Sequence, residues 1–153
     1  GVDVLSFGAT KNGAMAAEAV LFFNPDMASD FRFRRKRAGH LLSKMRFLSA
    51  QWDAYLSDGL WLRNARHAND MARRLTEGLA ALGSVTFLYP VDANEIFVTF
   101  PDSVRDALFS EGFAFYPWVD GGPDCHRLVT AFDTDPRDID AFIAVAREAG
   151  ANG

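Results

Sequence analysis

The residue best suited to covalent chemistry is Lys11, in the sequence DVLSFGATKNGA at residues 3–14. Residues 2–7 are apolar enough to form a strand covered on both faces, and small residues then make a tight loop around the lysine. A lysine on an ordered, partly desolvated loop has its charged form disfavoured, so its amine becomes a nucleophile for a carbonyl compound. The alternative is a surface loop whose lysine is simply solvated.

A second candidate is the run of positive charge at residues 31–37, FRFRRKR, in a chain whose net charge is −4. Such a cluster could hold a phosphate group or, with its interleaved phenylalanines, a nucleic acid. The rest of the chain supplies no comparable basic surface, so we expect no nucleic-acid partner. An ordinary solvated helix face is the remaining interpretation.

The third candidate is Arg127, in the segment His126-Arg127-Leu128-Val129-Thr130. Side chains alternate along a strand, so Arg127 would share an apolar face with Val129 and Ala131. An arginine in that setting needs an anion, and its planar fork suits a carboxylate. The residues alone leave open whether this anion is a ligand or a neighbouring Asp or Glu.

Composition excludes several other classes of protein. Hydrophobic residues make up 49% of the 153 residues and charged residues 24%, which is enough to bury a core. No apolar run approaches the roughly 20 residues that span a membrane, so we expect no membrane association. Three scattered histidines and one cysteine have no metal-site spacing, so no metal is predicted, and the lone cysteine fits the reducing cytoplasm.

The elements that must position these residues follow from apolar periodicity and turn residues. Strands are expected at residues 2–7, 16–23, 85–89, 95–100, 113–118 and 126–132. Helices are expected at residues 27–37, 42–57 and 59–83, then between Pro101 and Gly112, and finally from an N-cap at Asp135 to Gly150.

The helix at 59–83 has the clearest pattern. Its buried face is predicted to consist of Leu62, Ala65, Ala68, Ala72, Leu75, Leu79 and Leu82. On the solvated side, Arg66 with Asp70 and Asp70 with Arg74 have the i,i+4 spacing of ion pairs. At about 36 Å the helix would be long enough to bridge two domains.

The segment LSFGATKNG, followed by an alanine-rich strand, resembles the Schiff-base lysine region of fold-type I enzymes that use pyridoxal 5'-phosphate (PLP). The resemblance is closest to the threonine aldolase and β-eliminating lyase group and extends over essentially the whole chain. It implies that Lys11 binds the cofactor covalently and that Thr10 contacts its phosphate. The loop here reads Thr-Lys-Asn where the family more often has Ser-Lys-Gly.

Two further segments carry the same resemblance. The family has an Arg-Lys pair, a glycine-rich turn and a Met-Arg pair that reach the active site of a neighbouring subunit, which makes Lys36 and Arg46 cofactor-binding candidates here. The turn in this chain is longer and poorer in glycine, so His40 or Lys44 could take over a contact. The family motif Arg-Leu-Val-Thr-His implies that Arg127 binds the substrate's α-carboxylate, although Ala131 replaces its histidine.

The fold implied by the resemblance is α/β, the C-terminal portion of a fold-type I PLP-dependent transferase fold with a small α+β C-terminal domain. Residues 1–58 would complete the large PLP-binding domain, residues 59–83 would form the bridging helix, and residues 84–153 the small domain. The family places other cofactor contacts before the lysine. We therefore expect the chain alone to be inactive and to need a missing N-terminal half, within a dimer or tetramer that shares active sites.

The activity implied is a PLP-dependent aldolase that cleaves a threonine-like β-hydroxy-α-amino acid to glycine and an aldehyde. The base that would take the β-hydroxyl proton is not identifiable from the sequence. Two alternatives remain at this point: another PLP reaction, such as β-elimination or transamination, and a non-catalytic interaction module of the same fold.

Overall fold

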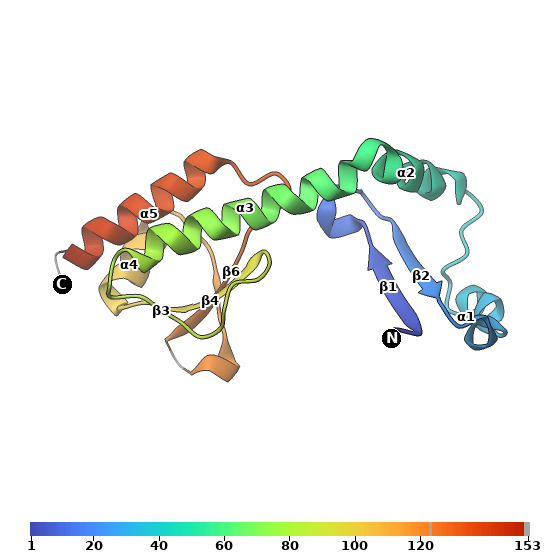
Figure 1. Ribbon diagram of the computed structural model, residues 1–153, viewed down its shortest axis with the longest axis horizontal. Coiled ribbons are helices and arrows are strands. Elements are labelled where there is room, and N and C mark those ends of the chain that lie inside the picture. The colour runs from blue at the N-terminus through green and yellow to red at the C-terminus, as the bar shows by residue number, and fades with distance from the viewer. Residues whose placement is uncertain (123, 152–153) are drawn as a thin grey trace. The chain divides into compact units, whose positions relative to one another are not determined.

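The structure is a computed structural model that describes residues 1–122 and 124–151. The chain divides into two compact units, Gly1–Arg63 and Asn64–Gly153. Helix α3 (Leu60–Ala80) begins in the first unit and continues in the second (Figure 1). No helix among the described residues combines the length and the apolar character needed to cross a membrane.

The first unit carries the lysine loop between two paired strands. Strand β1 (Val4–Gly8) runs antiparallel to β2 (Glu18–Phe22), as the hairpin in Figure 1 shows. A single-turn helix, η1 (Thr10–Asn12), lies between them and ends at Gly13. The helices that complete the unit are η2 (Pro25–Ala28), α1 (Phe31–Arg37), α2 (Arg46–Leu56) and η3 (Ser57–Gly59).

The expectation that the first strand is covered on both faces is wrong. Leu5 is 41% exposed, whereas Phe7 is half-buried and stacks on Trp52 with ring centroids 5.4 Å apart. Tyr55 and Trp61 complete this small aromatic core on one side of the hairpin. An apolar run predicts that a strand has a buried face, but it does not show whether one face or both faces are covered.

The single helix expected at residues 27–37 is split. The Asn24 carboxamide oxygen accepts the Asp26 N–H at 3.1 Å and starts the short turn η2, after which α1 begins separately at Phe31. The next helix, expected from residue 42, begins at Arg46. The long helix begins at Leu60, one residue after the expected position.

The second unit is a four-stranded antiparallel sheet with three helices packed on it. The strand order is β3-β4-β6-β5. The strands are β3 (Thr86–Phe87), β4 (Glu95–Thr99), β5 (Tyr116–Pro117) and β6 (Cys125–Val129). The helices after α3 are α4 (Asp102–Ser110), η4 (Val119–Gly121) and α5 (Pro136–Ala151).

The main core of this unit lies between one face of the sheet and helices α3, α4 and α5. Strand alternation puts Ile96 beside Leu128 and Val98 beside His126 on that buried face. Residues of all three helices fill the space above them, among them Leu75, Leu79, Val104, Leu108, Ile139 and Phe142. The strand positions between them face the other way, and Arg127 is one of these.

The buried face predicted for α3 is largely confirmed. Ala68, Ala72, Leu75 and Leu79 are buried, and Met71 joins them, whereas Leu62 is exposed.

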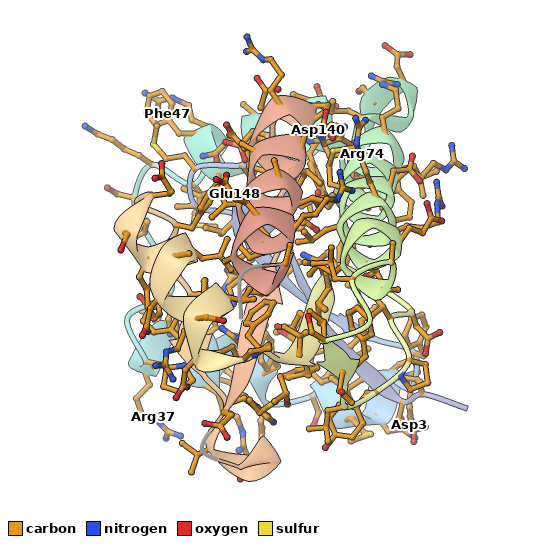
Figure 2. The ribbon with its side chains drawn as sticks, turned by 90° about the vertical axis from the view of Figure 1, so that its left-hand side faces the viewer. Asp3, Arg37, Phe47, Arg74, Asp140 and Glu148 are labelled. Atoms are coloured by element: carbon orange, nitrogen blue, oxygen red, sulfur yellow. The ribbon has the colours of Figure 1, made fainter. Side chains whose placement is uncertain are left out.

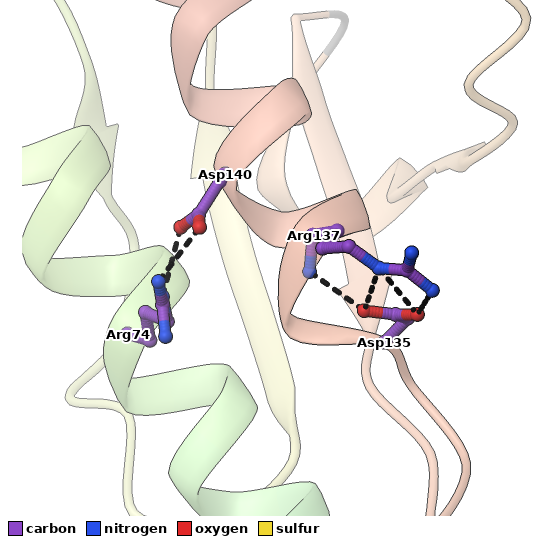
Figure 3. Close-up of polar contacts among 4 residues, drawn as sticks. All are labelled: Arg74, Asp135, Arg137 and Asp140. Carbon is purple, nitrogen blue, oxygen red and sulfur yellow. Dashed lines mark hydrogen bonds and ion pairs between the residues drawn. The ribbon is translucent and has the colours of Figure 1, made fainter.

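The predicted ion pair between Asp70 and Arg74 is wrong, because Asp70 pairs with Arg73 instead. The Arg74 guanidinium makes two hydrogen bonds, of 2.9 and 2.7 Å, to the Asp140 carboxylate of α5, which lies beside α3 (Figures 2 and 3). A bidentate partner on the adjacent helix satisfies the planar guanidinium better than a single contact within α3.

The N-cap predicted at Asp135 is confirmed. Its carboxylate accepts the backbone N–H of Arg137 at 2.8 Å, and the Arg137 guanidinium binds the same carboxylate (Figure 3). These Arg137 contacts, the side-chain hydrogen bond first, lower the pKa of Asp135 to about 2. The cap is therefore ionised at neutral pH.

Gly78 and Gly150 offer a matched test of how closely α3 and α5 pack. A Cβ at Gly78 would lie 2.3 Å from Cδ1 and 2.8 Å from Cγ1 of Ile143, whereas a Cβ at Gly150 would meet nothing nearer than 3.4 Å. Overpacking costs about 1–3 kcal/mol, and alanine is favoured over glycine in a helix by about 1 kcal/mol. We expect Gly78→Ala to lower the free energy of unfolding by about 1 kcal/mol and Gly150→Ala to leave it unchanged or raise it. Equal effects in urea unfolding would contradict this packing.

Candidate active site

The turn that carries Lys11 is fixed by its backbone, and the lysine itself is exposed. The Ala9 carbonyl accepts the N–H groups of Asn12 and Ala14, each at 3.0 Å, and the Ala9 N–H donates to the Ala17 carbonyl at 2.8 Å. Ala9 and Ala17 are fully buried. Lys11 is the middle residue of η1, and its exposure differs from the partly desolvated loop that we expected. The hairpin contacts hold the main chain and do not cover the side chain.

Thr10, the residue before the lysine, already has partners for its hydroxyl group. Its Oγ1 donates to Oε1 of Glu18 at 2.5 Å and accepts the N–H of Ala17 at 3.2 Å. Gly8 lies opposite Glu18 in the strand pair, and a Cβ there would lie 2.3 Å from the carboxylate oxygen Oε2. The absence of a side chain at Gly8 thus makes room for the Glu18 carboxylate. Glu18 was not among the site residues predicted from the sequence.

Asn12, the residue after the lysine, was also missed. Its Nδ2 donates to the Tyr55 hydroxyl at 2.5 Å and to the Trp61 carbonyl at 3.0 Å. The only signal in the sequence is that an asparagine takes the place of the family's glycine. Because its partners are 43 and 49 residues away along the chain, no local pattern reveals them.

The two cations proposed from the resemblance lie on different helices of the first unit. Lys36 is in α1 and Arg46 is the first residue of α2, and both are exposed. The Arg46 guanidinium lies 4.7 Å from the centroid of the Phe47 ring, and that of Arg32 lies 4.5 Å from the Phe33 ring. Both contacts leave guanidinium N–H donors available to an anion.

Arg127 lies on the face of the second unit's sheet that points away from the helices. It is opposite Phe97 on β4 and Tyr116 on β5, and its side chain is 38% exposed. Its Nη1 donates to Oε1 of Glu95 at 3.3 Å. On the face that we expected to be apolar, Val129 is 52% exposed whereas Cys125 is 1% exposed, so this face is only partly open to solvent. The predicted alternative, a salt bridge to an acidic neighbour, is therefore present.

An aromatic group lies next to Arg127 on the same face. The Phe97 ring contacts Trp118 at 4.8 Å and Tyr89 at 5.5 Å between centroids. The indole Nε1 of Trp118 is buried without a hydrogen-bond partner among the described residues. Because Phe97 is the strand partner of Arg127, these rings lie on the same side of the sheet as the guanidinium.

His126, next to Arg127, faces the core. It is 4% exposed, its Nδ1–H donates to the Asp124 carbonyl at 3.0 Å, and its ring lies against Phe115 and Phe100. Desolvation, aided by the charge of Arg105, lowers the pKa of His126. The neutral imidazole is therefore the form that the core accommodates.

Comparison with protein families gives one match. The profile described as "Beta-eliminating lyase" matches residues 1–103, which include the first unit and the first strands of the second.

Two curated proteins are similar to the chain in sequence. The low specificity L-threonine aldolase of Pseudomonas aeruginosa is 48% identical over 136 residues, and that of a Pseudomonas species is 45% identical over 135 residues. Each alignment covers 88% of this chain but 38% of the relative. The chain thus spans well under half the length of the relatives that it matches.

Among solved structures, the threonine aldolase of Leishmania major superimposes with a TM-score of 0.86 at 28% identity, over 97% of this chain and 43% of that one. The glycine decarboxylase P-protein matches with a TM-score of 0.52 at 18% identity, over 95% of this chain and 34% of that one, and supports the fold alone. The fold class predicted from the sequence, a portion of the fold-type I PLP-dependent transferase fold, is confirmed.

The burial of His126 predicts a pH-dependent stability. Its pKa in the folded protein lies below the unfolded value of about 6.5, so the unfolded chain binds more protons as the pH falls through that value. The free energy of unfolding should be highest above pH 6.5 and fall below it, by at most about 1.4 kcal/mol per pH unit from this group. His126→Gln should make the urea-unfolding midpoint change less between pH 7 and pH 5. His40→Gln, at an exposed position, should not have this effect. An unchanged slope in His126→Gln would contradict the assignment.

Proposed function

The chain belongs to the β-eliminating lyase family, and on that premise we propose that the intact protein is a PLP-dependent carbon–carbon lyase. Its substrate would be a threonine-like β-hydroxy-α-amino acid, cleaved to glycine and an aldehyde. The observation that carries this proposal is the likeness, at 48% and 45% identity, to two low specificity L-threonine aldolases. Because the chain covers 38% of those relatives, the activity is proposed for the intact protein and not for this chain alone.

The residues present fit the cofactor. Lys11 offers an exposed primary amine on a turn whose backbone is fixed, and the neighbouring residues of that turn, Ala9, Gly13 and Ala14, are small. When bound, PLP supplies an electron sink for the bond that breaks at the substrate's Cα. Lys11 is proposed to hold it covalently through the ε-amine.

The phosphate contacts are proposed for three side chains. Lys36 and Arg46 have exposed cationic groups, and in a homo-oligomer with shared active sites they would serve the neighbouring subunit. Thr10 is proposed as a further contact on the residue adjacent to Lys11. Since its hydroxyl hydrogen is directed at Glu18, that contact requires the hydroxyl to exchange partners.

Arg127 is proposed to bind the α-carboxylate of the amino acid. Its bond to Glu95, at 3.3 Å, is longer than the roughly 2.7–2.9 Å of a strong charge-assisted bond, so it competes weakly for the guanidinium. The planar fork could then receive a substrate carboxylate through two parallel N–H donors. A carboxylate held in this way fixes the rotation of the substrate about its Cα–N bond and so determines which bond at Cα breaks.

The organisation proposed for the intact protein follows the same reasoning. Residues 1–58 would complete a large PLP-binding domain, and residues 84–153 would form the small domain. Residues 59–83 would form the bridging helix between these two domains. A missing N-terminal half would supply the remaining cofactor contacts, in a cytoplasmic dimer or tetramer.

The role of Lys11 can be tested directly in the intact protein. After incubation with PLP and reduction with borohydride, mass spectrometry should find the cofactor on Lys11. Lys11→Ala should lose both this adduct and detectable turnover, whereas Lys44→Ala should keep the adduct.

The reaction type can be tested by product analysis of the intact protein, in which threonine should give glycine and acetaldehyde. Ammonia and a 2-oxo acid as the main products would contradict aldol cleavage and favour β-elimination.

The role of Arg127 can be separated from its salt bridge to Glu95. Arg127→Lys keeps the charge but loses the fork, and we expect KM for the amino acid to rise about 10–100-fold, as for the loss of a charged hydrogen bond of about 1.5–3 kcal/mol. Glu95→Gln removes the competing carboxylate and should leave KM unchanged or lower it. If both variants change KM and stability alike, Arg127 serves only the salt bridge.

A further inference from the structure

The turn that carries Lys11 is tied to two helix ends by a single side chain, that of Asn12. The two hydrogen bonds of its Nδ2 go to the hydroxyl of Tyr55, near the end of α2, and to the carbonyl of Trp61, in the first turn of α3. We propose that Asn12 is a positioning residue for Lys11, which sets where the lysine amine lies by holding this turn. The inference rests on the proposed function, because it concerns the same amine.

Lys11 needs positioning from outside its own side chain. It is exposed, and a lysine has a flexible four-carbon stem, so its amine is located chiefly by the position of the turn. The turn is a single-turn helix of three residues followed by Gly13 at φ +111°. Short helices of this kind have poor hydrogen-bond geometry, and the two donors here share one acceptor, the Ala9 carbonyl. Contacts to neighbouring elements must therefore add to its rigidity.

The partners of Asn12 are themselves held firmly. Tyr55 is 4% exposed, and its ring packs with those of Phe7 and Trp52. Between Tyr55 and Trp61 the chain bends sharply, with two consecutive left-handed residues, Asp58 at φ +51° and Gly59 at φ +69°. This bend brings a hydroxyl and a carbonyl from two different helices to one amide group.

The amide uses both of its N–H donors in this arrangement, so any rotation of the side chain loses at least one bond.

The tie on the other side of Lys11 is weaker. The Thr10–Glu18 hydrogen bond is exposed to solvent, whereas both Asn12 bonds are partly buried. Water can replace the partners of an exposed group at little cost, but a partly buried donor that loses its acceptor is left unsatisfied. The two Asn12 bonds therefore hold the turn more strongly than the Thr10–Glu18 bond does, while the second Thr10 bond, from the Ala17 N–H, stays within the hairpin itself.

The test uses four variants of the intact protein. Asn12→Ala removes both bonds, and Tyr55→Phe removes one acceptor while keeping the ring. Asn12→Asp keeps an acceptor for the Tyr55 hydroxyl but loses the donor to Trp61. Asn24→Ala is the matched control, since it removes a side-chain hydrogen bond of an asparagine in the same unit that does not touch the Lys11 turn.

Three measurements are compared. In the cofactor-free protein, the backbone N–H groups at positions 12 and 14 should exchange with solvent about tenfold faster in Asn12→Ala than in wild type. This is the effect expected for the loss of one net hydrogen bond. In the loaded protein, the pH at which the visible absorbance of the lysine-bound cofactor changes should shift. The value of kcat should fall more than KM rises. Tyr55→Phe and Asn12→Asp should have intermediate effects, and Asn24→Ala none.

The outcomes separate this inference from the proposed function. A wild-type protein with no lysine-bound cofactor would overturn both. A lysine-bound cofactor in wild type, with unchanged absorbance titration and exchange in Asn12→Ala, would overturn the inference alone. A lower melting temperature of Asn12→Ala, with no change in the absorbance titration or in the ratio of kcat to KM, would assign Asn12 a merely structural role. That outcome would also overturn the inference. If Asn12→Ala does not fold, Tyr55→Phe carries the same comparison.

Discussion

The structure around the candidate lysine depends on one buried residue, Ala9. Its N–H and carbonyl close the hairpin through three backbone hydrogen bonds, and its side chain has no exposed surface. A larger side chain there would have to displace the aromatic core, and a broken closure would release both Thr10 and Asn12 from their positions. The chemistry proposed for Lys11 therefore rests on main-chain hydrogen bonds that the lysine does not make.

In the second unit, the corresponding constraint is strand register. Along β6, His126 and Leu128 are buried and Arg127 lies on the opposite face. A shift of one residue in the pairing with β4 would bury the guanidinium and expose the imidazole. The packing of Leu128 against Ile96 and the helices prevents that shift, so the apolar core determines where the one cation of this strand is presented.

The order and type of most elements could be predicted from the sequence, because periodicity, caps and turns are local properties. The N-cap at Asp135 and most of the buried face of α3 are confirmed on that basis. The partners of Arg74 and Asn12 could not be predicted, since they come from distant parts of the chain. The exposure of Leu5 was missed for a related reason: an apolar strand does not report how many layers cover it.

The amine and the guanidinium are thus held by different kinds of interaction. Lys11 depends on backbone and amide hydrogen bonds within Gly1–Arg63, whereas Arg127 depends on strand alternation over the apolar core of Asn64–Gly153. Substitutions that share no partners usually have additive effects on free energy. If one arrangement serves to bind the cofactor and the other to bind the carboxylate, changes around Asn12 should act on covalent chemistry and changes around β6 on substrate binding. Strong non-additivity between Asn12 and Arg127 variants would contradict this independence.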